Sequence, residues 1–314
     1  MEIAVAIPAY NRADLLEATL DSVLGQTLAP AEVFVYDDGS SDHTREVLSR
    51  QPSRVRWQTG PNLGPGMARA AAIAGSSAPW VALCDSDDLW QPDHLEGLAA
   101  LRKRWPAVTL MFSNFETFGP SSGPALCKFE SAPAGWWSQR VIARDGGACL
   151  LGGAPYRQLL SFQPIFPSTM LFARATYARI GGSAPEVSRW PLEDAHLTRR
   201  LLLASTVACT WSRTCRIRRH PGNFSRADLR NDEGRLRILQ MLRGDPLLAP
   251  DDAAATEQEI ARSVPRLFRG YFHAREYAAA AKLAASHPAM SLGWRRGIAA
   301  LLGGRTHRAP GLPS

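Results

Sequence analysis

The chain has 314 residues, of which 45% are apolar and 21% are charged, and its formal net charge is +7. This length and composition predict a well-buried core and either one large domain with an appendage or two domains. Because the positive charge is spread along the chain, the basic balance favours an anionic lipid or an anionic small substrate and disfavours nucleic acid.

Secretory and membrane-spanning proteins are also disfavoured. The apolar run after Met1 is short and has no basic lead-in, unlike a signal peptide, and no stretch approaches the roughly 18 apolar residues of a membrane span. The 5 cysteines form no CxxC pair and leave an odd count, which favours reduced thiols over a disulfide framework. We therefore expect a cytoplasmic protein that is soluble or, at most, peripheral on the cytoplasmic face of a membrane.

The first third of the chain alternates short apolar runs with helical stretches. The runs expected to form strands are 3–7, 32–36, 54–59 and 80–84. The stretches expected to form helices are 12–25, a segment that opens at residue 44, and 66–77. This alternation predicts an α/β fold with a parallel sheet covered by helices on both faces.

Acidic side chains follow two of the expected strands. Asp37 and Asp38 come after the second strand, and Asp85, Asp87 and Asp88 come after the fourth. Ligands of a parallel α/β sheet bind beyond the carboxyl ends of its strands, so we expect both groups to face one crevice. Like charges this close repel each other, and a bound ligand is needed to make the grouping tolerable.

Beyond residue 110 the pattern loosens, and 119–160 has little periodicity. Expected elements in chain order are a strand at 109–119, a strand at 168–174, a helix at 191–204 and a strand at 207–220. After residue 226 the composition becomes helical, with an apolar stripe in 260–272 and a small-residue helix at 275–288. The segment 291–304 either packs as a helix or lies on a surface with a basic face. We expect a helical region over 226–304 and a disordered tail over 305–314.

Five segments in order carry a family resemblance, and they read AIPAYNRADLLEATLDSVLGQT, VYDDGSSDHT, NLGPGMARAAAI, DSDDLWQPDHL and EDAHLTRR. Over about residues 1–225 the chain resembles family 2 glycosyltransferases of the GT-A fold. The resemblance implies a Rossmann-like, mainly parallel sheet in which 1–110 bind the nucleotide sugar and 111–225 bind the acceptor. It also implies inverting transfer from a UDP-sugar to a hydroxyl group, in surface glycan or glycoconjugate synthesis.

A bound divalent cation would explain why the acids of the D-x-D segment, Asp85-Ser86-Asp87, stand so close together. Mn²⁺ and Mg²⁺ prefer oxygen ligands and take one or two protein carboxylates, while phosphates and water complete their shell. The cation would relieve the repulsion between the acids. The resemblance implies that Asp87 binds this ion, that Asp85 faces the ribose or the ion, and that His220 contacts the metal or the diphosphate. Asp88 either belongs to the group or caps the following helix.

The resemblance also assigns residues to the nucleotide. Asp38 matches the position that accepts a hydrogen bond from the uracil edge, with Asp37 beside it, although both acids also suit a tight turn. Pro8 and Tyr10 match the segment that lines the base, where Tyr10 offers a stacking face. Arg69 matches an arginine that approaches the diphosphate or Asp38.

Asp194 matches the catalytic base of the family. An inverting transfer is one in-line displacement, so a single carboxylate must take the proton of the acceptor hydroxyl. Glu193 either raises the pKa of Asp194 by repulsion or orients the acceptor. Without the other motifs, the two acids would suit a helix N-terminus equally well. Trp136 and Trp137 are candidate stacking platforms for an acceptor sugar or, alternatively, core residues.

Two other functions are compatible with the sequence. A sugar-1-phosphate nucleotidyltransferase would carry a glycine-rich phosphate loop after the first strand, where PAYNRADLL stands instead. A non-catalytic protein of the same fold would use its helical tail to bind a partner. The sequence leaves the acceptor open among glycans, lipid-linked sugars, peptides and small molecules.

Overall fold

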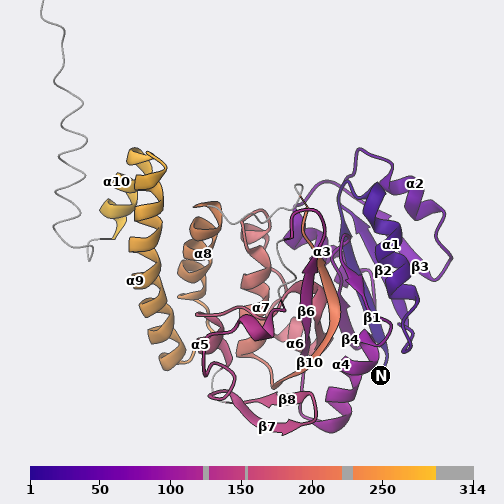
Figure 1. Cartoon of the computed structure of the whole chain (residues 1–314). Coiled ribbons are helices and arrows are strands. Elements are labelled where there is room, and N and C mark those ends of the chain that lie inside the picture. Colours follow the sequence, from indigo (N-terminus) through magenta and orange to yellow (C-terminus); the bar gives the residue numbers. More distant parts are fainter. Residues whose placement is uncertain (123–126, 153–154, 221–228, 288–314) are drawn as a thin grey trace, which may run out of the picture.

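The computed structural model describes residues 1–122, 127–152, 155–220 and 229–287. Within these ranges the strands form one ten-stranded sheet in the order β3-β2-β1-β4-β9-β6-β10-β8-β7, with β5 paired to β10 (Figure 1). The strands are β1 (Ile3–Ala9), β2 (Glu32–Asp37), β3 (Val55–Thr59), β4 (Trp80–Leu83), β5 (Leu89–Trp90), β6 (Leu110–Phe118), β7 (Val141–Asp145), β8 (Ala148–Leu151), β9 (Met170–Ala173) and β10 (Val207–Arg218). The helices are α1 (Ala13–Leu24), α2 (Thr44–Ser49), α3 (Pro65–Ala74), α4 (His94–Arg104), α5 (Pro155–Leu159), α6 (Arg174–Arg179), α7 (Glu193–Leu203), α8 (Leu229–Leu242), α9 (Pro250–His273) and α10 (Tyr277–Ser286).

The N-terminal half of the sheet is parallel, as predicted. Strand β1 pairs in parallel with β2 and β4, and β2 pairs in parallel with β3. Strand β9 then inserts antiparallel between β4 and β6, which makes the whole sheet mixed. The hairpin β7–β8 and the helix α5 lie in the stretch that the sequence left without periodicity. Strand β7, strand β8 and helix α5 are each only four or five residues long, which is too short to show a hydrophobic period.

Strand β1 explains why the sheet has a core on each face. All seven of its residues are buried, and successive side chains point to opposite faces. Val5 and Ile7 pack in the cluster that contains Leu16 and Leu20 of α1. Ala6 packs in the other cluster, which contains the small side chains of α3. The apolar run is therefore continuous because helices cover both faces.

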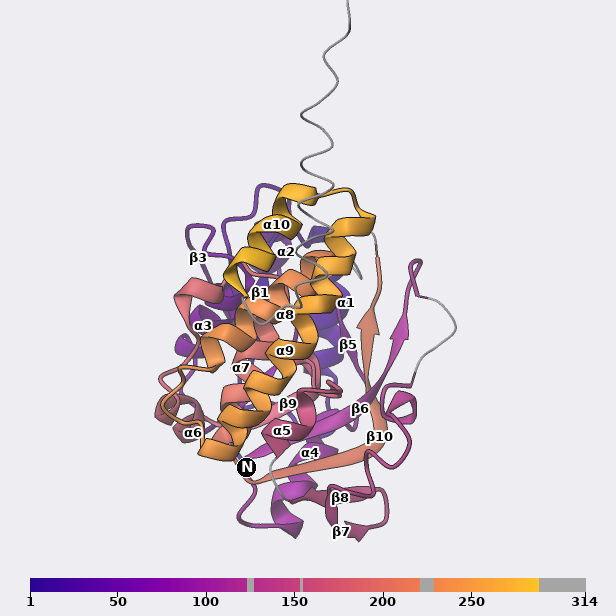
Figure 2. The same cartoon turned by 90° about the vertical axis from the view of Figure 1, so that its left-hand side faces the viewer.

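The C-terminal helices extend one of these two cores. Apolar residues of α8, α9 and α10 belong to the same cluster as those of α7 and β6. In Figure 1 these three helices lie beyond α7, on the side away from β3, and Figure 2 shows α8 and α9 in front of the sheet. The segments 291–304 and 305–314, for which we expected a helix and a disordered tail, lie outside the described residues. No described helix is both long enough and apolar enough to cross a membrane.

Two helical glycines give a matched test of this packing. A Cβ on Gly234 of α8 would clash with the carbonyl oxygen of Pro191, whereas a Cβ on Gly97 of α4 would meet no atom within 4 Å. We expect Gly234→Ala to lower the free energy of unfolding by roughly 1–3 kcal/mol, because α8 must move away from the chain that enters α7. Gly97→Ala should raise it by about 0.5–1 kcal/mol through its higher helix propensity. Urea denaturation measures both, and equal midpoints would contradict the close contact between α8 and Pro191.

Candidate active site

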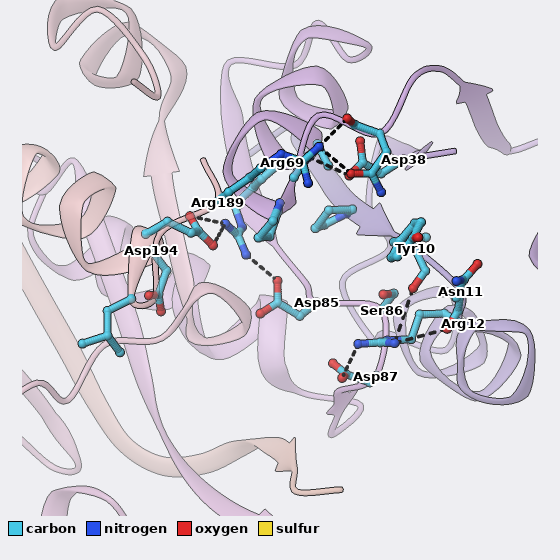
Figure 3. A pocket seen from close by; sticks show the side chains of 18 residues that line it. Tyr10, Asn11, Arg12, Asp38, Arg69, Asp85, Ser86, Asp87, Arg189 and Asp194 are labelled. Atoms are coloured by element: carbon cyan, nitrogen blue, oxygen red, sulfur yellow. Dashed lines mark hydrogen bonds and ion pairs between the residues drawn. The ribbon is translucent and has the colours of Figure 1, made fainter. Parts of the chain in front are cut away.

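A cavity of about 550 Å³ opens at the carboxyl ends of β1, β2 and β4 and reaches the first turn of α7 (Figure 3). The predicted site residues that line it are Pro8, Tyr10, Asp38, Arg69, Asp85, Asp87, Glu193 and Asp194. The two acidic strand ends therefore face one crevice, as the sequence indicated. Its remaining lining consists of Ala9, Asn11, Arg12, Asn62, Gly64, Pro65, Ala68, Ser86, Arg189 and Leu192.

Arg69 occupies the centre of the pocket wall. Its Nη1 donates to both carboxylate oxygens of Glu193, at 2.8 and 3.0 Å, and its Nη2 donates to Asp85 at 2.9 Å. The side chain is only 4% exposed. In this structure Arg69 thus pairs with two acids of the pocket and not with Asp38, which was one of its two expected partners. The reason is geometric, because the guanidinium fork suits carboxylates on two sides at once.

Burial sets the charge state of the acids around Arg69. It raises the pKa of Glu193 to about 7, although the neighbouring guanidinium acts to lower it. It also raises the pKa of Asp194, and the negative charge of Asp85 adds to this effect. The oxygens of Glu193 are engaged by Arg69, so burial, rather than repulsion by Glu193, is the main cause of the raised pKa of Asp194.

The chain enters α7 through a strained residue. Leu192 has φ 64° and ψ 28°, a left-handed conformation that costs a β-carbon residue about 1–2 kcal/mol. The turn places Glu193 and Asp194 at the N-terminus of the helix, where the backbone dipole favours negative charge. Both carboxylates therefore lie at the edge of the pocket.

Two predicted metal ligands are in contact. His220 Nε2 lies 3.0 Å from Asp87 Oδ2, and Arg12 Nη2 lies 3.5 Å from the same oxygen. A carboxylate with one imidazole is a suitable protein share for Mn²⁺ or Mg²⁺ when a diphosphate supplies further oxygens. Among the described residues no three His, Cys, Asp or Glu side chains gather to hold an ion. The donor set therefore fits a cation that is held jointly with a substrate.

Asp88 does not cap the next helix. Its side chain accepts hydrogen bonds from Ser168 Oγ at 2.5 Å and from the backbone N–H of Arg218 at 2.8 Å, and it is buried. Asp93 occupies the N-cap position of α4 instead. Burial and the charges of Asp87 and Asp85 raise the pKa of Asp88 well above its usual range. Asp88 thus ties the D-x-D turn to β10 and the segment before β9.

The two acids at the carboxyl end of β2, Asp37 and Asp38, have different roles. Asp38 lines the pocket, and its two oxygens accept from the backbone N–H groups of Leu63 and Gly64 at 2.6 and 2.9 Å. Asp37 is fully buried and accepts from Thr59 Oγ1 at 2.7 Å, so it holds the turn together and does not reach the pocket. Tyr10 is 46% exposed at the rim, where its ring is free to stack.

The two tryptophans lie in the core and not at the pocket. Trp136 and Trp137 are 3% and 8% exposed, and Trp137 donates from Nε1 to the carbonyl oxygen of Phe129 at 3.0 Å. The two indoles pack edge to face, with ring centroids 4.6 Å apart. A stacking platform needs an open ring face, so this structure corrects their assignment to the acceptor site.

Sequence reasoning missed two cations that line the pocket. Arg12 contacts Asp87, and Arg189 donates from Nη2 to the backbone and side-chain oxygens of Asn62 at 2.6 and 2.7 Å. Arg12 follows the end of the first strand just as the acids follow the second and fourth, which was a usable signal. Arg189 lies before α7 in a segment without periodicity, and nothing in the sequence marks it.

Residues 4–127 match the protein-family model described as Glycosyl transferase family 2. The chain is similar to the UDP-Glc:alpha-D-GlcNAc-diphosphoundecaprenol beta-1,3-glucosyltransferase WfgD of Escherichia coli, with 34% identity over 150 residues, 47% of this chain and 58% of that protein. It is also similar to the chondroitin synthase of Pasteurella multocida, with 37% identity over 97 residues, 30% of this chain and 10% of that protein. The chain thus spans less than two thirds of the length of these relatives.

Two solved structures share the architecture. Residues 1–349 of S. aureus TarS in complex with UDP-GlcNAc align with a TM-score of 0.60 and 18% identity, over 86% of this chain and 73% of that one. The mannosyltransferase PcManGT from Pyrobaculum calidifontis in complex with GDP-Man and Mn²⁺ also gives a TM-score of 0.60 and 18% identity, over 98% and 81%. The predicted GT-A fold is therefore confirmed.

The pairing of Arg69 predicts a pH-dependent loss of stability. We expect Arg69→Met to lower the free energy of unfolding by about 3–5 kcal/mol at pH 8, because Asp85 and Glu193 lose their buried counter-charge. The pKa of Glu193 is about 7 in the folded state and 4.5 in its ordinary range. A carboxyl with a raised pKa destabilises the folded state progressively as the pH rises from the ordinary pKa to the pKa of the folded state. Without Arg69 the pKa of Glu193 rises beyond 7, so this carboxyl is protonated at pH 5 and the loss should be smaller there.

Urea denaturation at the two pH values measures this difference. The double variant Arg69→Met/Glu193→Gln is the control, because a neutral amide needs no counter-charge and should recover part of the loss at pH 8. The proposed pairing would be contradicted if Arg69→Met lowered the free energy of unfolding equally at both pH values and if Glu193→Gln did not reduce that loss.

Proposed function

Because residues 4–127 form a segment of glycosyl transferase family 2, we propose that the protein is a metal-dependent, inverting glycosyltransferase that uses a UDP-sugar donor. The observation that carries this proposal is the pocket itself, in which Asp38, Asp85, Asp87 and Asp194 surround one cavity. A pocket of about 550 Å³ is within the usual size range for a small-molecule ligand. The acceptor is a hydroxyl compound of a surface glycan or glycoconjugate pathway.

Asp194 is the proposed general base. Its carboxylate takes the proton of the acceptor hydroxyl as that oxygen attacks the sugar carbon from the face opposite the nucleotide. The raised pKa of Asp194 makes the carboxylate a better proton acceptor than an exposed aspartate. Arg69 supports this role by holding Glu193, so that the neighbouring acid is compensated and fixed.

Asp87 and His220 are the proposed protein ligands of a divalent cation. When bound, the cation would supply stabilisation of the negative charge that develops on the leaving diphosphate. Arg12 is placed to help, since its guanidinium already faces Asp87. Pro8 and Tyr10 would line the base, and Asp38, which is fixed by two backbone amides, would accept from it.

The relatives support the donor and the metal. TarS has been solved with UDP and with UDP-GlcNAc, the name of WfgD includes UDP-Glc, and PcManGT has been solved with GDP-Man and Mn²⁺. The name of WfgD also specifies a diphospholipid-linked acceptor. These names favour a UDP-sugar over a GDP-sugar and keep a lipid-linked acceptor among the candidates.

A thermal-shift screen tests donor and metal together. We expect UDP-sugars with Mn²⁺ to raise the melting temperature of the wild-type protein, and GDP- and dTDP-sugars to do so less. In Asp87→Asn the part of the shift that depends on Mn²⁺ should disappear, because the variant loses the charged oxygen ligand. Binding of no UDP-sugar, with or without metal, would support the alternative of a non-catalytic partner-binding protein.

The role of Asp194 predicts a separate loss. Asp194→Asn should lower kcat by a factor of about 10²–10⁴, because no other group takes the acceptor proton, while UDP binding stays unchanged. The rate of UDP release with a panel of hydroxyl acceptors measures turnover. Asp14→Asn is the matched control, since Asp14 is an exposed acid in the first turn of α1. Full turnover by Asp194→Asn would refute the assignment.

A further inference from the structure

The guanidinium of Arg12 stands beside the carboxylate that we propose as the metal ligand (Figure 3). Its Nη2 lies 3.5 Å from Oδ2 of Asp87, and the same oxygen lies 3.0 Å from Nε2 of His220. Arg12 and Asp87 both line the cavity. A guanidinium stays charged in proteins, so a divalent cation that approached this oxygen would meet a positive charge at close range. The pairing with Arg12 therefore opposes the binding of a metal ion to Asp87.

The backbone of Arg12 is held firmly, whereas its guanidinium is held loosely. The backbone N–H of Arg12 donates to Thr44 Oγ1 at 2.8 Å, and that of Asn11 donates to Ser40 Oγ at 2.9 Å. The guanidinium Nη1 makes only long contacts, at 3.2 Å to the carbonyl oxygen of Asn11 and 3.4 Å to that of Tyr10. The side chain is also 24% exposed. The guanidinium is therefore able to change its partner while the backbone stays in place.

Arg12 differs from the other arginines of the pocket. Arg69 is buried between two carboxylates, and Arg189 donates to two oxygens of Asn62. Of the arginines that line the cavity in the described ranges, Arg12 is the one that pairs with a proposed metal ligand. Its pairing is therefore the one that must change when a cation takes the oxygen of Asp87.

We propose that Arg12 is a resident counter-ion that makes cation binding at Asp87 depend on the donor nucleotide. In the nucleotide-free protein Arg12 neutralises Asp87 and resists a second cation there. A donor diphosphate beside Asp87 offers the guanidinium a doubly hydrogen-bonded partner, so Arg12 turns to the phosphate oxygens and leaves Asp87 to the metal. The inference rests on the proposed function, because it takes Asp87 as the ligand of the cation.

Removal of the guanidinium should improve metal binding in the absence of nucleotide. Met has a similar length and no charge, so Arg12→Met leaves Asp87 without its competing cation. We expect the variant to bind Mn²⁺ about fivefold more tightly than the wild type when no nucleotide is present, which is the size of effect that a partly exposed ion pair allows. The electron paramagnetic resonance signal of free Mn²⁺ measures this affinity in a titration of the full-length protein.

The same substitution should weaken the coupling between metal and nucleotide. The coupling factor is the Kd of UDP without Mn²⁺ divided by its Kd with saturating Mn²⁺, and isothermal titration calorimetry measures both. Linkage is reciprocal, so the gain in Mn²⁺ affinity without nucleotide must reappear as a loss of coupling if Arg12 leaves Asp87 in the UDP complex. We therefore expect the coupling factor of Arg12→Met to be about fivefold lower than that of the wild type.

Three further variants control these measurements. Arg50→Met removes the same charge from an exposed pair with Glu46, in which the ions lie 3.8 Å apart, and should change neither quantity. Arg12→Lys keeps a positive charge but not the guanidinium fork, so it should lie between the wild type and Arg12→Met. Arg12→Gln repeats the loss of charge with a polar side chain and replaces Arg12→Met if that variant does not fold.

The outcomes separate this inference from the proposed function. If the wild type binds UDP with Mn²⁺, but the neutral variants of Arg12 bind Mn²⁺ no more tightly without nucleotide and keep the coupling factor, only the present inference fails. An arginine that merely attracts the nucleotide would give that result, because its loss weakens UDP binding equally with and without metal. If UDP does not bind, or if Asp87→Asn binds Mn²⁺ like the wild type, the proposed function fails and the inference fails with it.

Discussion

The arrangement of the pocket depends on one buried guanidinium. Arg69 is fixed on α3 and joins Asp85, which follows β4, to Glu193, which begins α7. Glu193 is buried and Asp85 is half-buried, so two acids this close need a positive charge between them, and an ion pair of a buried arginine is costly to break by removing one partner. The contact also links the two halves of the fold, since Arg69 and Glu193 are 124 positions apart. The proposed base Asp194 is therefore positioned through its neighbour.

Charge is distributed unevenly around this centre. Carboxylates gather at the strand ends, and the buried guanidinium of Arg199 on α7 has no hydrogen-bond partner for Nε and Nη1 among the described residues. Each group is unfavourable in the free protein, because burial penalises charge and like charges repel. Perturbed ionisable groups of this kind concentrate at functional sites, where ligands of opposite charge compensate them.

The sequence predicts the N-terminal half of the fold and most of the pocket. The apolar run of β1, the periodicity of α1 and the acids after β2 and β4 are local signals, and parallel topology brings strand ends together without further information. Contacts between distant segments could not be read in the same way. The pairing of Arg69 with Glu193, the tie from Asp88 to Ser168 and the burial of Trp136 all depend on how the later half packs against the earlier one.

Backbone strain gives an independent indication of where the function lies. Among the described residues other than glycine, Asn11, Leu192 and Arg275 have positive φ. Asn11 and Leu192 both line the pocket, Asn11 just beyond the end of β1 and Leu192 directly before α7. Arg275 lies in the turn between α9 and α10, so positive φ alone does not mark a site. Asn tolerates this conformation, but Leu does not, and the strain at Leu192 persists because the surrounding contacts fix the turn that directs Glu193 and Asp194 towards the cavity.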